Sequence, residues 1–110
     1  MTSATLMDSL ARLLEGKDER VGFVLKTGEI VEVENICPDK DNGFEVRGED
    51  LMKYAVDAEA SWHTHPGHTK CLSANDHYAF LNYPHLKHYI VGTDGVECYV
   101  VKNGIVVIAS

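Results

Sequence analysis

Short β-rich segments, separated from one another by glycine, proline or asparagine turn signals, constrain the fold of this chain most. They predict strands at residues 20–26, 29–36, 60–65, 87–92, 96–102 and 105–108, with a further short strand at 44–46. Segment 29–36 alternates acidic and apolar residues, and Thr27-Gly28 separates it from the preceding strand. We therefore expect these two strands to form a hairpin with one solvated face.

Three helices are expected among the strands. Leucines recur at helical spacing over residues 6–14 and are followed by Gly16, which is typical of an amphipathic helix with a glycine C-cap. A short helix is predicted at 49–55, and another opens at Ser73 and ends before Pro84. This order predicts an α/β fold with one mixed sheet flanked by helices.

Length and composition indicate one ordinary globular domain. The chain has 110 residues, 45% hydrophobic and 25% charged, so residues 1–110 are expected to form a single domain. The net charge of −7, with scattered Lys and Arg, disfavours nucleic acid as a partner. No apolar run reaches the ~20 residues of a membrane span, and the N-terminus lacks a secretory pattern. A cytoplasmic protein without a membrane partner is expected.

The three cysteines predict neither a disulfide framework nor a cysteine-zinc site. Cys37, Cys71 and Cys98 stand far apart in the sequence, with no CxxC pair. Such a set is typical of reduced thiols. Cys71 is interpreted as a small buried apolar residue, because free cysteine is commonly buried.

Histidines are concentrated in one segment, where the chemistry is expected. Five of the six lie between His63 and His85. Residues two apart on a strand face the same side, so His63 and His65 present two imidazoles to one point, and Pro66 ends the strand there. Asp76, in the first turn of the next helix, is placed where it can supply a third, oxygen ligand. Two nitrogens and one carboxylate leave a fourth position for water, as in catalytic zinc sites.

A plainer interpretation exists for part of this pattern. Ser73 followed by Asp76 resembles a capping box, which needs no metal. The two interpretations are compatible, because Ser73 can cap the helix and still expose its hydroxyl. The other histidines have modest interpretations: His68 and His77 are expected at the surface, and His85 and His88 at the surface or in satisfied hydrogen bonds. Trp62 should face away from the ligands into the core.

The spacing His63-x-His65-Pro66, six residues, then Ser73-x-x-Asp76 resembles the signature of the JAMM (MPN-plus) metallopeptidases. The resemblance implies that His63, His65 and Asp76 bind Zn²⁺ and that Ser73 stabilises the oxyanion. It also implies an MPN/JAB-like fold, similar to the cytidine-deaminase-like architecture. The compact prokaryotic and phage branch, including phage tail assembly domains, is the most similar.

The general base is less well defined by the residues alone. Glu32 and Glu34 alternate with valines and are interpreted as a solvated strand face. Glu19 and Glu59 then remain as equal alternatives. The family resemblance favours Glu19, because Glu19-x-x-Gly22 followed by two apolar residues is similar to the family's upstream strand motif.

The expected function is zinc-dependent hydrolysis of peptide or isopeptide bonds through a metal-activated water, with Glu19 as base. The substrate would be a peptide or protein, including a ubiquitin-like protein or its conjugate, with docking helped by a fused or partner domain. The alternatives are a peptidoglycan-directed hydrolase and a phage tail assembly or binding module of the same fold, which would place the protein in a virion or host cytoplasm. A zinc deaminase is excluded, because its His-x-Glu and Pro-Cys-x-x-Cys elements are absent.

Overall fold

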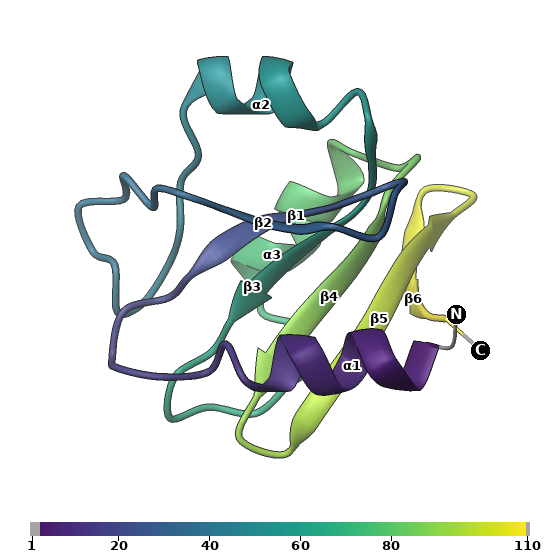
Figure 1. Cartoon of the computed structure of the whole chain (residues 1–110). Helices are drawn as coiled ribbons and strands as arrows, with labels where there is room; N and C mark the ends of the chain where they lie inside the picture. Colours follow the sequence, from purple (N-terminus) through teal and green to yellow (C-terminus); the bar gives the residue numbers. More distant parts are fainter. Residues whose placement is uncertain (1–2, 110) are drawn as a thin grey trace.

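The computed structural model describes residues 3–109, which form one α/β domain built on a six-stranded mixed sheet (Figure 1). Its elements are α1 (Ser3–Ala11), β1 (Val21–Leu25), β2 (Ile30–Val33), α2 (Gly48–Tyr54), β3 (Ala58–Thr64), α3 (Ala74–Leu81), β4 (Lys87–Gly92), β5 (Gly95–Lys102) and β6 (Ile105–Ile108). The strand order is β2-β1-β3-β4-β5-β6. All neighbouring strands are antiparallel except β3 and β4, whose connection runs through α3.

The three predicted helices and six of the seven predicted strands are present, with three local differences, one of which is that β2 ends at Val33 instead of residue 36. Residues 44–46 form no strand, and Ile36 N–H donates to the Glu45 carbonyl across the intervening loop. Helix α1 ends at Ala11 rather than continuing to residue 14, because the chain turns there with Leu13 N–H bonded to the Leu10 carbonyl. Gly16, at a φ of 69°, lies in the loop that follows.

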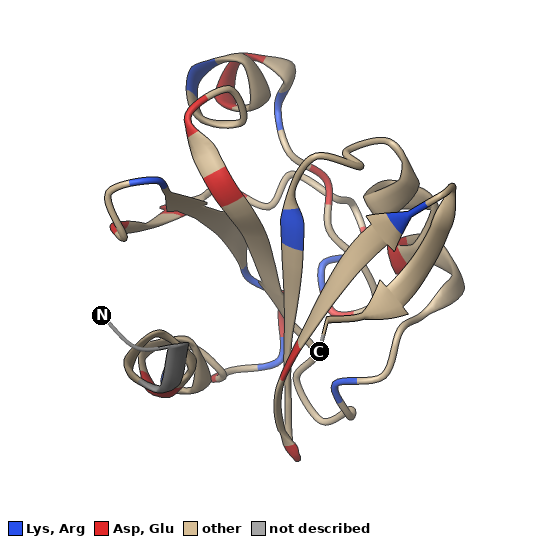
Figure 2. Ribbon diagram, turned by 90° about the vertical axis from the view of Figure 1, so that its right-hand side faces the viewer, with Lys and Arg blue, Asp and Glu red and all other residues tan. Residues whose placement is uncertain are grey.

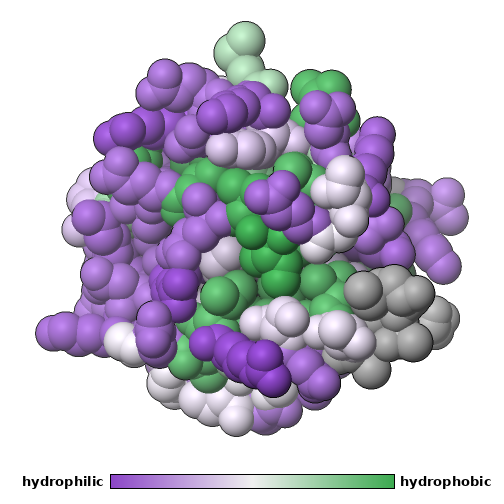
Figure 3. All heavy atoms as spheres, in the orientation of Figure 1, coloured by the Kyte–Doolittle hydropathy of each residue, from purple (hydrophilic) through white to green (hydrophobic). Residues whose placement is uncertain are grey.

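The helices cover opposite faces of the sheet. Helix α1 packs across β4 and β5 on one face, and α3 packs on the other, against β5 and β6 (Figure 1). The core under α1 contains Leu10 and the fully buried Trp62, as predicted. Figure 3 shows apolar atoms exposed on this face of the molecule, away from α3. The other face carries the residues of the candidate site.

Gly22 explains why β1 lies so close to its neighbours. A Cβ at this position would overlap the Val31 carbonyl oxygen and lie 2.8 Å from the Trp62 ring. Only glycine leaves room for both the hairpin partner and the buried indole. The glycine of the motif therefore has a packing role that is independent of catalysis.

Buried His88 is held as a neutral ring, the hydrogen-bonded alternative of the sequence prediction. Its Nε2 lies 2.9 Å from the Tyr83 carbonyl, which can only accept, so Nε2 carries the proton. Nδ1 then accepts from the Ser61 hydroxyl at 2.6 Å. The ring also stacks on Phe80 at a centroid distance of 4.2 Å. Burial lowers the pKa of His88 to about 4.

This histidine should make folding stability sensitive to acid. The pKa of His88 is lower in the folded chain than in the unfolded one, so the stabilisation is complete above pH ~6.5 and is lost as pH falls toward 4. We expect a loss on the order of 2–3 kcal/mol over this window. His88→Gln, which keeps a donor for Tyr83 without titrating, should flatten that part of a denaturation-versus-pH curve. The matched change at exposed His85 should leave the curve as in the wild type, and equal curves for both variants would contradict the assignment.

Among the described residues, the basic ones are not gathered on one element. Figure 2 shows Lys and Arg spread over separate elements, with Asp and Glu between them. Among residues 3–109, no helix is both long and apolar enough to span a membrane.

Candidate metal centre

The end of β3 brings two imidazole nitrogens together with one carboxylate. His63, His65 and Asp76 are 1%, 7% and 3% exposed. Asp76 Oδ1 lies 2.9 Å from His63 Nε2, and its Oδ2 lies 3.0 Å from His65 Nε2. The two Nε2 atoms are 3.1 Å apart. The three residues that the sequence predicts as ligands therefore converge on one point, although β3 and α3 are separated by a loop.

No placement of protons on the two rings turns all three of these close contacts into hydrogen bonds. The Thr69 carbonyl lies 2.8 Å from His65 Nδ1, so that nitrogen carries a proton and a neutral His65 directs the lone pair of Nε2 at the Asp76 carboxylate. Protonating both Nε2 atoms would satisfy Asp76 but would set two N–H groups against each other at 3.1 Å. One cation between the three donors would resolve both conflicts.

The charge state of the cluster follows from its surroundings. Burial lowers the pKa of His63. Burial also acts to lower the pKa of His65, but hydrogen bonds to Asp76 and Thr69 and nearby negative charge raise it overall. Burial acts to raise the pKa of Asp76, yet the hydrogen bonds and charges of the two histidines hold it well below its usual range. The cluster thus keeps an ionised carboxylate beside at least one lone pair.

The Thr69 carbonyl reaches His65 because Gly92 has no side chain. A Cβ at Gly92, the last residue of β4, would overlap the backbone of Thr69 and Lys70. The loop between the histidines and α3 can therefore lie directly on the sheet. Orienting partners of this kind commonly contribute 10–100-fold to metal affinity.

Substituting Gly92 with alanine should consequently weaken metal binding from outside the ligand set. We expect Gly92→Ala to lower zinc affinity by about 10–100-fold, because the displaced loop withdraws the carbonyl from His65. Competition against a chromophoric chelator would measure the change. Gly48→Ala, where nothing lies within 4 Å of the added Cβ, is the control. If a folded Gly92→Ala protein binds zinc with unchanged affinity, the loop that carries Thr69 does not contribute to the site.

Asp76 also belongs to the helix cap, so both interpretations of the sequence motif apply. Ser73 Oγ accepts from Asp76 N–H at 3.1 Å, and Ser73 N–H donates to Asp76 Oδ2 at 3.2 Å. The capping box fixes the carboxylate against the two rings. Ser73 itself is exposed, and its hydroxyl uses only a lone pair in the cap. The hydroxyl proton remains available to another acceptor.

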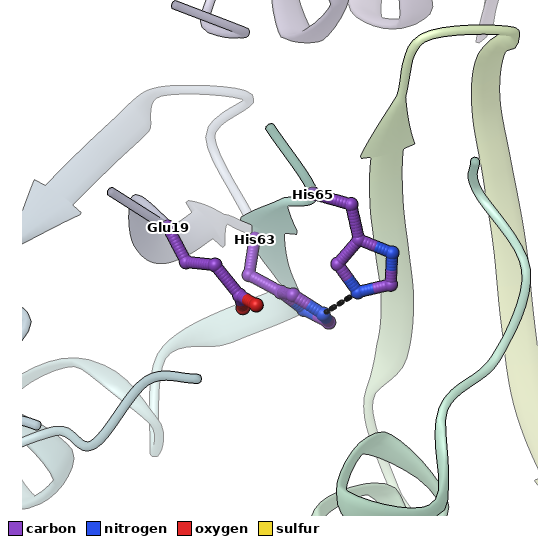
Figure 4. Close-up of side chains that lie close together, drawn as sticks. All are labelled: Glu19, His63 and His65. Atoms are coloured by element: carbon purple, nitrogen blue, oxygen red, sulfur yellow. Dashed lines mark hydrogen bonds between the residues drawn. The ribbon is translucent and has the colours of Figure 1, made fainter. Parts of the chain in front are cut away.

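The carboxylate of Glu19 points toward the two histidine rings (Figure 4). Ligand atoms of Glu19, His63 and His65 all lie within 4.8 Å of one another. Glu19 is 9% exposed, and burial raises the pKa of its carboxyl to about 7, against the opposing charge of His65. Such a carboxyl can take up and release a proton near neutral pH. Glu59, its sequence-level alternative, is exposed on β3.

Asn35 positions Glu19, and sequence analysis did not identify it. The buried Asn35 amide donates to the Glu19 carbonyl at 2.8 Å and to the Gly43 carbonyl at 3.0 Å. Its Oδ1 accepts from Cys37 N–H at 3.0 Å, which is an Asx-turn contact. An asparagine two residues before Cys37-Pro38 is a local signal of that turn. Its link to Glu19 is long-range and leaves no mark in the sequence.

Two spaces with common lining residues open beside the His63, His65 and Asp76 cluster. One, of about 250 Å³, is lined by His65 and by the loop residues His68 and Cys71. The other, of about 150 Å³, is lined by Asp76 and the 37–44 segment. Glu19 and Ser73 line both spaces, so the predicted base and hydroxyl face the same cleft. Cys71 is exposed there, and its interpretation as a buried apolar residue is wrong.

None of the protein-family models compared with the chain matches it, and no curated protein gives a significant match. The function of the chain is therefore inferred from its residues and their geometry.

Proposed function

We propose that this protein is a zinc-dependent hydrolase of peptide or isopeptide bonds. The observation that carries the proposal is the convergence of three donors at the end of β3, with separations of 2.9–3.1 Å. Tetrahedral zinc ligands with bonds of ~2.0–2.1 Å lie about 3.3 Å apart, so small movements would fit them to the ion. The donor set of two imidazoles and one carboxylate also matches catalytic zinc chemistry.

His63, His65 and Asp76 would hold the metal, and the fourth position would face the cleft. Asp76 is assigned as the ligand because it contacts both rings, whereas Glu19 lies farther out in the same cleft. The Thr69 carbonyl holds His65 with Nε2 directed at the site. When bound, Zn²⁺ supplies a Lewis acid that lowers the pKa of water toward ~7 and polarises a carbonyl.

The chain's own groups would carry out the proton transfers. Glu19 takes a proton from the attacking water and delivers it to the leaving amine, which its raised pKa suits. The Ser73 hydroxyl donates to the oxygen that gains negative charge, and loss of one such donor typically costs about 10²–10³ in rate. No nucleophilic side chain is needed, so no covalent intermediate with the protein forms.

This assignment agrees with the resemblance to the JAMM metallopeptidases. The mixed sheet with helices on both faces accommodates an MPN/JAB-like arrangement, in which the histidine strand and the following helix supply the metal ligands. The proposed partner is a peptide or protein substrate, including the tail of a ubiquitin-like protein. Docking surfaces on a fused or partner domain would strengthen binding.

The test combines metal analysis with hydrolysis. Protein purified without chelators should contain about one zinc per chain. It should cleave flexible peptide or C-terminal isopeptide linkages, and a zinc chelator should stop cleavage reversibly. Ubiquitin-like conjugates and peptidoglycan fragments would be compared in the same assay.

Each outcome has a distinct meaning. Chelator-sensitive cleavage confined to peptidoglycan would redirect the activity to cell-wall cross-links. Bound zinc with no turnover on any substrate would favour a binding or assembly module. Absence of zinc from a folded protein would contradict the proposal.

A further inference from the structure

An apolar pocket lies behind His63, on the α3 side of the sheet. Its volume is about 60 Å³. The walls come from β1, the segment after the 37–43 loop, α2 and the end of α3, and include Phe23, Phe44, Val46, Leu51, Phe80 and Leu86. Several wall residues, including Val46 and Leu51, are only half-buried, so the pocket is not enclosed by fully buried residues alone.

This pocket adjoins the catalytic cleft through common walls. Phe44 and Ala79 line both the pocket and the space beside Asp76. The Phe44 ring packs against the His63 ring at a centroid distance of 4.5 Å, and His63 is itself a wall of the pocket. A group in the pocket therefore lies against the back of a metal ligand. Successive residues of an extended peptide advance ~3.3 Å, so such a group belongs within a few residues of the scissile bond.

Of the polar side chains in the pocket wall, Ser61 and His88 have partners, and the partnerless Trp62 Nε1 is fully buried in the core that contains Leu10. Ser61 donates to His88, and His88 donates to the Tyr83 carbonyl. His63 directs Nε2 away, toward Asp76 and His65. A polar substrate group would lose water in this pocket without gaining a partner, whereas an apolar group would lose nothing.

We propose that this pocket is a specificity site of the proposed peptidase and takes a branched aliphatic side chain of the substrate, such as leucine. The inference rests on the proposed function, because the occupant is defined by the wall residues that the pocket shares with the catalytic cleft. An apolar cavity of ~150 Å³ accepts benzene, and one of ~10–15 Å³ holds a single water. The intermediate volume suits a leucine or valine side chain and is too small for tryptophan.

Binding to the zinc-loaded Glu19→Gln protein tests the pocket without turnover. The probes are a capped pentaglycine and its analogues with leucine or tryptophan at one position, titrated by NMR. The best leucine peptide should bind about 10–100-fold more tightly than pentaglycine. Its resonance shifts should centre on Val46, Leu51 and Phe80. The tryptophan peptides should gain little.

Two variants and a control complete the test. Val46→Phe should fill the pocket and remove the leucine preference, and Leu51→Ala should widen it and admit tryptophan. Val56→Phe makes the matched change at a residue that is 74% exposed and outside the pocket, so the preference should persist. No leucine preference, or shifts confined to the α1 face, would overturn the inference. If the protein prefers leucine peptides but the wild type shows no turnover, only the peptidase function is overturned. If the wild type turns over peptides without preferring leucine, only the role of the pocket is overturned.

Discussion

Replacing Glu19 with glutamine is expected to leave zinc bound and the fold intact while lowering peptide hydrolysis by about 10²–10⁴-fold. Glutamine preserves the shape of the side chain but cannot accept the water's proton. The buried position is an advantage for the base, because burial raises the pKa of the carboxyl to about 7. Steady-state kinetics together with metal analysis of the same preparation would separate loss of the base from loss of the ion.

Glu59→Gln is the control for this prediction. Glu59 lies at the start of β3 with its side chain exposed, so its substitution should change the rate by less than twofold. A larger loss at Glu59 than at Glu19 would reverse the assignment of the base. A Glu19→Gln protein that lacks zinc would make Glu19 a ligand, because its carboxylate lies within 4.8 Å of both rings.

The choice between these two glutamates shows what the sequence can predict and what it cannot. By strand periodicity, Glu59 falls on the same face as Ser61 and His63. The pairing of β1 with β3 slips at this point, because Val24 pairs with Ala60 while the next residue, Leu25, pairs with Ala58. The irregularity places Glu59 outside the regular alternation. A one-residue slip of this kind depends on the partner strand, so the residues of β3 alone did not reveal it.

The convergence of His63, His65 and Asp76 was predictable because its geometry is local. His63 and His65 follow the two-residue period of one strand, and Ser73 and Asp76 follow the first turn of one helix. The supports for these groups are long-range. Asn35 holds the backbone of Glu19 from 16 positions away, and Gly92 admits the loop that orients His65. Such contacts appear only when the topology of the sheet is known.

The second large effect is expected at Asp76, whose Oδ2 contacts both His65 of the proposed metal site and the N–H of Ser73 in the helix cap. Asp76→Asn keeps an oxygen that can accept from Ser73 N–H, so α3 should retain its first turn. The variant lacks the negative charge that contacts both imidazoles at 2.9 and 3.0 Å. We expect zinc affinity to fall by more than about 100-fold, because even residues that only orient a ligand contribute 10–100-fold.

Asp8→Asn provides the matched control, since it makes the same change in net charge on the exposed surface of α1. It should bind zinc as the wild type does, which would exclude a general charge effect. Thermal unfolding of the metal-free proteins should place Asp76→Asn within a few degrees of the wild type, because the cap survives. If Asp76→Asn still binds one zinc tightly while Glu19→Gln does not, the two carboxylates exchange roles. Glu19 would then complete the metal site with His63 and His65, and Asp76 would serve the helix alone.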